Sequence, residues 1–79
     1  MARQAEVDTA TLERGALLYD SALSEVGEYR GVAGPYVMLR PVGGGREWEA
    51  DPGAVRLATP AERLSAGVRL ANARAEQGL

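Results

Sequence analysis

The residues best suited to acid–base chemistry are two glutamates, Glu47 and Glu49, which lie two positions apart in a segment of strand-forming residues. Alternate residues of a strand share one face and are roughly 6.5–7 Å apart, a separation at which two carboxylates can act as general acid and general base. The commoner role of such a pair is to stay solvated and to pair with arginines across a hairpin, here Arg40 or Arg46. We therefore expect structural charges here and no catalytic pair.

The remaining composition offers few groups for catalysis or metal binding. The 79 residues include no cysteine and no histidine, and all nine basic residues are arginine. A serine or threonine nucleophile would lack its usual base, and zinc would lack its usual ligands. Glu47, Glu49 and Asp51 do not have the spacing of a calcium loop. The sequence thus predicts that the protein is not an enzyme and needs no metal or cofactor.

Three consecutive glycines, residues 43–45, could in principle cradle a phosphate. Phosphate-binding glycine loops stand between a strand and a helix, and in P-loops a Lys-Ser/Thr pair follows them. Neither feature accompanies this triplet. Because glycine adopts positive φ without steric cost, and because strand formers flank the triplet, the segment predicts the tip of a β-hairpin.

Three arginines suggest a possible contact with nucleic acid. Arg30, Arg40 and Arg46 alternate along the predicted strands with Tyr36 and Trp48, a pattern that can neutralise and stack a single strand. Glutamates are interspersed on the same strands, and the chain has a net charge of −2 and a pI near 5.0. A basic face is the usual signature of a nucleic-acid binder. We therefore keep nucleic-acid binding as the alternative function.

A protein-binding surface is the preferred hypothesis. On the strand that begins at Tyr36, alternation places Val37 and Leu39 toward a core, and it places Tyr36 and Met38 on the outer face. Trp48 is either a core anchor or an aromatic contact for a ligand, since the sequence permits both. The predicted partner-binding set is Tyr36, Met38, Arg40, Trp48 and Leu70, which could bind a protein partner or a second copy of this chain.

Short strands separated by glycine and proline turns must position these residues. A chain of 79 residues forms one domain at most, with a small core. Residues 16–26 fit either a strand followed by a turn or a single helix. Residues 25–32 alternate with Val26, Tyr29 and Val32 inward, and we expect a bend or bulge at Gly27 or Gly31. The hairpin over residues 36–50 and a closing strand at residues 55–57 would follow.

The clearest local signal is the start of a helix at Thr59-Pro60-Ala61-Glu62. Thr59 suits the N-cap, Pro60 the first helical position, and Glu62 the reciprocal position of a capping box. The helix should extend to about Glu76, before Gly78. Its apolar residues form one narrow, alanine-rich stripe suited to a sheet edge or another helix, with Leu70 on the opposite side; the stripe is Ala61, Leu64, Val68, Ala71 and Ala75.

These elements predict a mainly β fold with a C-terminal helix. We expect a flexible arm at residues 1–14 with a possible helical turn, a bent antiparallel sheet of about five strands at residues 15–58, and a helix at residues 59–77 that packs on the sheet or on a partner. The segments at residues 15–20, 26–29 and 34–50 resemble small SH3-like barrels of the KOW and PRC type and short uncharacterised actinomycete proteins. The resemblance implies a five-stranded barrel with a non-catalytic binding role.

The sequence also bears on location. It contains no apolar run long enough for a membrane span, and its first residues lack the apolar segment of a signal peptide. We therefore expect a small regulatory or accessory protein of the cytoplasm. Its predicted partner is another protein or a second copy, with no membrane contact.

Overall fold

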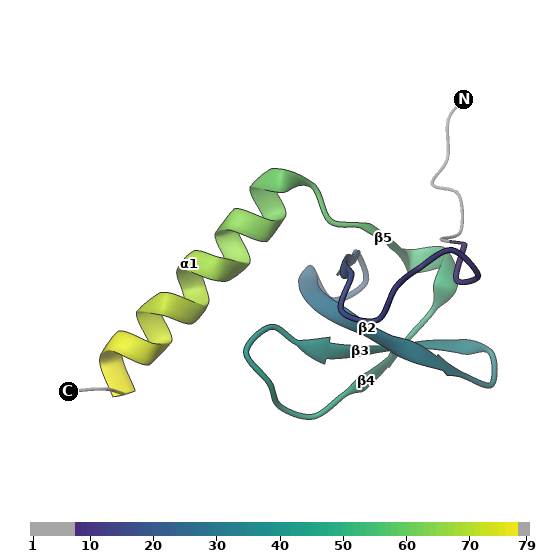
Figure 1. The fold of residues 1–79 in the computed structure, drawn as a ribbon, viewed down its shortest axis with the longest axis horizontal. Helices are drawn as coiled ribbons and strands as arrows, with labels where there is room; N and C mark the ends of the chain where they lie inside the picture. The colour runs from purple at the N-terminus through teal and green to yellow at the C-terminus, as the bar shows by residue number, and fades with distance from the viewer. Residues whose placement is uncertain (1–7, 78–79) are drawn as a thin grey trace.

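A computed structural model describes residues 8–77 as a small sheet with one long helix beside it (Figure 1). This confirms the predicted mainly β fold with a C-terminal helix. The expected flexible arm falls partly on residues 1–7, outside the described residues, while residues 8–11 form a turn in which the Asp8 side chain accepts a hydrogen bond from Ala10 N. The elements are β1 (Leu17–Asp20), β2 (Glu25–Ala33), β3 (Tyr36–Pro41), β4 (Trp48–Ala50), the 3-10 helix η1 (Pro52–Ala54), β5 (Val55–Leu57) and α1 (Pro60–Gln77).

The five strands form one antiparallel sheet in the order β4-β3-β2-β1-β5. The strands β4 and β5 are therefore at opposite edges, yet only Asp51 and η1 connect them. A flat sheet of five strands would be about 19 Å wide, and a 3-10 turn advances only about 2 Å per residue. The short connection therefore requires the sheet to curl strongly, as the sequence predicted.

The first two strands resolve an alternative that the sequence left open. Residues 17–20 are strand β1, and a turn follows at residues 21–24, so the helical alternative for residues 16–26 is wrong. In β2 the register with β3 shifts between Tyr29 and Gly31, which makes Arg30 the extra residue of a bulge. The irregularity thus lies directly before Gly31, one of the two glycines at which a bend or bulge was predicted, whereas Gly27 is regularly paired with both neighbouring strands.

The core lies inside the curl. It contains the predicted Val37 and Leu39, but Val32, which was expected to point inward, is 54% exposed. The reason is the length of β2, because β1 pairs with it only as far as Glu28 and leaves its last residues uncovered. The buried core residues are Leu18, Tyr29, Val37, Leu39, Ala50 and Val55.

The Trp48 side chain crosses the inner face of the curled sheet. Its indole packs against the core, and its Nε1 donates a 2.9 Å hydrogen bond to Oδ2 of Asp20 on β1. On the way the ring passes Gly27 of β2, where an added Cβ would be 2.7 Å from Cη2 of the indole. Asp20 is only 3% exposed, and its Oδ1 accepts from Ala22 N at 3.0 Å. Trp48 thus joins β4 to β1 across two intervening strands, as a core residue.

The helix begins as predicted. Thr59 Oγ1 accepts a hydrogen bond from Glu62 N at 3.1 Å, and Glu62 Oε1 accepts one from Thr59 N at 2.9 Å. These two bonds are the reciprocal pair of a capping box. The predicted boundaries are confirmed, since α1 extends from Pro60 to Gln77.

The face that the helix turns to the sheet differs from the simplest expectation. Ala66 is 6% exposed and Leu70 is half-buried, whereas Leu64 of the predicted stripe is 70% exposed and Val68 is 49% exposed. Packing of the stripe against a sheet edge was therefore wrong. The physical cause is Glu62: it is bonded to β5, and the residues four and eight positions after it on the helix are Ala66 and Leu70.

We predict that Gly27→Ala destabilises the domain by about 1–3 kcal/mol, the usual cost of an overpacked core. The added methyl group would approach the Trp48 ring and, at 3.0 Å, Leu39 Cβ. Chemical denaturation followed by Trp48 fluorescence measures the change. Gly67→Ala is the control: a Cβ there meets nothing within 4 Å, and the helix should gain up to about 1 kcal/mol. Equal stability of Gly27→Ala and the wild type would contradict the placement of the indole.

Candidate functional site

The residues predicted to bind a partner are divided between two sides of the sheet. Tyr36, Met38 and Arg40 share the outer face of β3, where Tyr36 is 41% exposed and the other two are half-buried. Trp48 lies opposite Leu39 on the core side. Leu70 lies on α1, with its side chain over the glycine hairpin. Only the first three therefore belong to a common surface.

The three arginines of the alternative function do not form a uniform basic stripe. Arg30 lies 3.8 Å from Glu47, measured from Nε to Oε2. Arg40 is opposite Glu28 in the β2–β3 register. Arg46 is exposed in the loop before β4. Acidic side chains therefore accompany two of the three, and binding of nucleic acid by this set stays a prediction.

The two glutamates with the spacing of a catalytic pair are both exposed. Glu49 is in β4, but Glu47 precedes the strand and pairs with Arg30, where Arg40 or Arg46 had been expected. Nowhere in residues 8–77 do three or more acidic side chains converge as metal ligands would. Glu47 therefore lies at ion-pair distance from the arginine at the register shift of β2, without a hydrogen bond to its Nε.

The glycine triplet is a docking point for the helix. All three glycines have positive φ, as predicted for a hairpin tip, and Gly44 N donates to Pro41 O at 2.9 Å. A Cβ on Gly43 would be 2.5 Å from Leu70 Cδ1, so the bare backbone makes room for the leucine. The loop therefore belongs to the helix–sheet contact.

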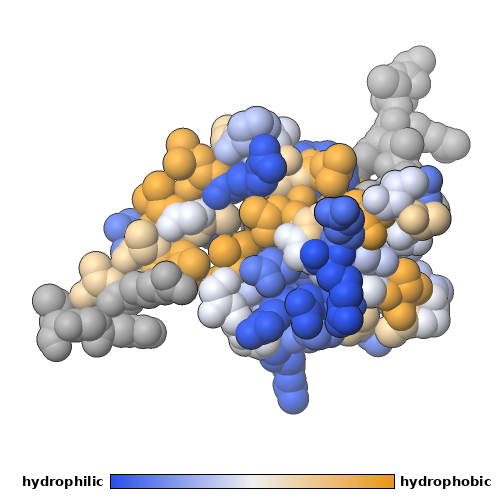
Figure 2. Space-filling view, viewed as in Figure 1, coloured by the Kyte–Doolittle hydropathy of each residue, from blue (hydrophilic) through white to orange (hydrophobic). Residues whose placement is uncertain are grey.

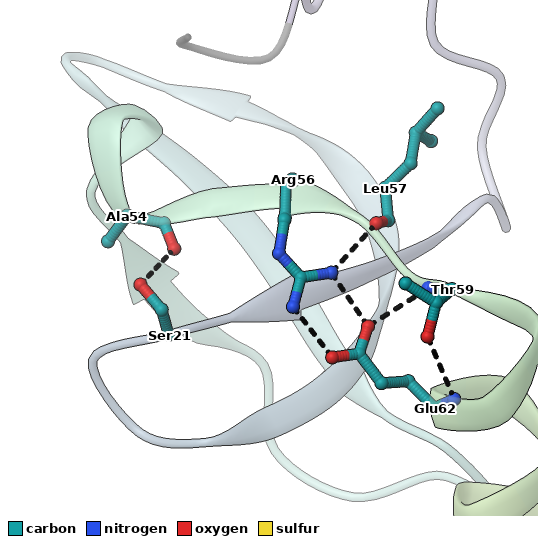
Figure 3. A network of polar contacts seen from close by, with 6 residues as sticks. All are labelled: Ser21, Ala54, Arg56, Leu57, Thr59 and Glu62. Atoms are coloured by element: carbon teal, nitrogen blue, oxygen red, sulfur yellow. Dashed lines mark hydrogen bonds and ion pairs between the residues drawn. The ribbon is translucent and has the colours of Figure 1, made fainter. Parts of the chain in front are cut away.

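The most extensive polar network lies where β5 meets α1 (Figure 3). Both terminal nitrogens of Arg56 donate to the Glu62 carboxylate at 2.7 Å, and Arg56 also donates to the carbonyl of Leu57 at 3.2 Å. The guanidinium lies 4.5 Å from the centre of the Tyr19 ring, within cation–π range. The hydrogen bonds from Arg56, followed by that from Thr59, lower the pKa of Glu62 to about 2. These hydrogen bonds all join groups within the chain, which is typical of a structural clamp.

Between the helix and the sheet are two open grooves of about 240 and 310 Å³. The two grooves adjoin each other, because both are lined by Val26 and Arg69. Apart from Arg69 and the acidic residues their walls are small or apolar. The remaining lining residues are Glu25, Pro41, Val42, Ala66 and Leu70 in the smaller groove, and Tyr19, Ser24, Glu62 and Ser65 in the larger.

The opposite side of α1 is a continuous apolar surface in contact with solvent. We call it the outer stripe; it consists of Ala61, Leu64, Val68, Ala71 and Ala75, all of which are exposed. Hydrophobic side chains gather along the helix in Figure 2. The sequence identified these residues as one face. It could not show that Ala66 and Leu70, on the other face, would be the pair that docks on the sheet.

The chain has no match among protein-family models, curated proteins or solved structures. Within residues 8–77, α1 is too polar to qualify as a membrane-crossing helix. Among the surfaces described above, the outer stripe stands out because its residues are apolar and yet exposed to solvent.

We predict that acidification weakens the attachment of α1 to the sheet. Because the folded pKa of Glu62, about 2, lies below the ordinary value of 4.5, its contribution to stability is complete above about pH 4.5 and is lost as the pH falls toward 2. Amide hydrogen exchange of α1 between pH 5 and pH 2.5, corrected for the intrinsic exchange rate, measures the loss.

Glu62→Gln is the matched control for this titration. It keeps the shape of the side chain but removes its charge, so the helix should be less protected at pH 5 and should show less further loss on acidification. Identical pH profiles for the wild type and Glu62→Gln would contradict the role of the Arg56–Glu62 pair.

Proposed function

We propose that this protein is a small, non-catalytic protein-interaction module of the SH3-like type, with an accessory or regulatory role. The outer stripe carries the proposal. In it, Leu64 is 70% exposed and Val68 is 49% exposed on the same side of one helix. Contiguous apolar patches on small proteins commonly mark the place where another protein binds.

The energetics favour a covered stripe. Burial of a leucine or valine side chain contributes about 1.5–3 kcal/mol relative to an exposed one. The domain itself cannot provide this burial, since Ala66 and Leu70 already occupy the sheet-facing side of α1. A partner can cover the stripe without any rearrangement of the sheet.

The outer face of β3 supports the same class of function. Tyr36 is 41% exposed, and its partner across the hairpin, Ala33, is exposed as well. Met38 and Arg40 continue this face along the strand. An exposed tyrosine beside aliphatic side chains is a composition that protein interfaces favour. We treat this face as a second, smaller contact surface of the module.

The SH3-like assignment is supported by the connectivity. Four strands follow one another as a meander, and the fifth returns to pair with the first. One 3-10 turn bridges the two edges. A short connection of this kind between the two edges is what a small, partly open barrel requires, and it supports the SH3-like part of the proposal.

Site-specific photo-cross-linking in cells of the native host tests the proposal. A photoreactive amino acid replaces Leu64, and a second variant carries it at Leu23, which is also exposed, at 56%, but lies in the β1–β2 turn. We expect protein adducts at position 64 well above those at position 23, whether the partner is another protein or a second copy. Equal labelling at the two positions would overturn the outer stripe as the binding surface.

A further inference from the structure

We infer that the outer stripe pairs with the outer stripe of a second copy of this chain, as two antiparallel helices. This inference rests on the proposed function, because it names the partner of the same surface. The first observation is the spacing. Successive residues of the stripe are three, four, three and four positions apart, which is the spacing of the a and d positions of a heptad.

The distribution of sizes along the stripe is complementary to itself. After Ala61 come the two larger residues, Leu64 and Val68, and the alanines Ala71 and Ala75 follow. If two copies run antiparallel, Leu64 of one copy meets Ala75 of the other, and Val68 meets Ala71. Each layer then combines a large and a small side chain, the arrangement that fills space best between facing helices. A parallel pair would set leucine on leucine and leave alanine facing alanine.

The residues that flank the stripe permit close approach. Ser65 and Asn72 border one side of it, and Gly67 borders the other together with Arg74, seven positions later; the first three are exposed and uncharged. Small flanking residues let two helix backbones come near each other. A two-fold pair would thus meet no like-charge repulsion from these three positions. An antiparallel pair also sets the N-terminal end of each helix dipole against the C-terminal end of the other.

The fold leaves room for the second copy. The outer stripe lies on the opposite side of α1 from Ala66 and Leu70, which contact the sheet. In Figure 1 the C-terminal part of α1 extends past the end of the sheet. The second helix can therefore lie along α1 without displacing any contact of the folded domain.

The seam is short, so we expect a weak dimer. In this register only four stripe residues per helix face one another, Leu64, Val68, Ala71 and Ala75, which places the contact at the small end of specific interfaces. Its dissociation constant should lie in the micromolar to millimolar range. The dimer would then respond to the concentration of the chain.

Sedimentation equilibrium of the full chain, from about 10 µM to 1 mM, measures the association. We expect a monomer–dimer equilibrium that Leu64→Gln weakens at least tenfold, because the substitution enters the symmetric seam twice. Leu23→Gln is the matched control and should leave the equilibrium unchanged. A monomer at every concentration, or a dimer that Leu64→Gln does not weaken, would overturn the inference.

Disulfide exchange tests the relative orientation of the two helices. Because the chain has no native cysteine, only the introduced cysteines can form disulfides. Leu64→Cys and Ala75→Cys chains are mixed in equal amounts in a glutathione buffer, and the products are separated by mass. An antiparallel pair predicts an excess of the mixed disulfide over the statistical half. An excess of the two homodimeric disulfides would overturn the antiparallel register.

The cross-linking experiment and the association experiments can overturn the two proposals independently. Adducts at position 64 to a different protein, together with a monomeric chain in the centrifuge, would leave the proposed function standing and overturn the self-pairing. Equal adducts at positions 64 and 23 would overturn the proposed function itself. Adducts between two copies, together with a dimer sensitive to Leu64→Gln, would support both.

Discussion

The hydrogen bond from the Trp48 indole to the buried Asp20 carboxylate is the interaction on which the rest of the structure depends. A sheet of five short strands has few apolar side chains with which to hold its curl, and this chain contains no phenylalanine. One indole that reaches from β4 past Gly27 to β1 supplies both apolar area and a polar anchor. Because tryptophan offers only one N–H, the acceptor must sit at one place, and this fixes how far the sheet can curl.

The same constraint explains the position of the helix. A curled sheet brings β5 beside β1, where Arg56 lies over the Tyr19 ring and binds the Glu62 carboxylate. Glu62 is also the reciprocal partner in the capping box of α1, so one side chain starts the helix and sets its rotation. The helix is then fixed mainly by its first turn, by Ala66 and by Leu70 over Gly43. Such light docking leaves the other side of the helix uncovered.

The sequence predicted those features that depend on neighbours along the chain, and it failed where distant residues decide. The capping box, the bulge beside Gly31 and the alternation of Val37 and Leu39 all follow from local spacing, and the structure has each of them. The side of α1 that faces the sheet does not follow from local spacing. The outer stripe of the helix contains more hydrophobic residues than the opposite side, where Ala66 and Leu70 lie, so spacing favours the wrong side. The bond between Glu62 and Arg56 turns the weaker face toward the sheet, and the spacing of hydrophobic residues gives no sign of a partner six residues earlier on a strand.

This preference for the weaker face gives the helix two distinct roles. If the stripe had docked on the sheet, the domain would have buried Leu64 and Val68 and presented a polar helix to solvent. Instead a charged clamp and a small alanine contact hold the helix, and the more hydrophobic side is kept outward. A substitution on the outer stripe should then leave the fold intact, whereas one at the clamp should destabilise it. That separation is the property expected of a module whose function is to bind.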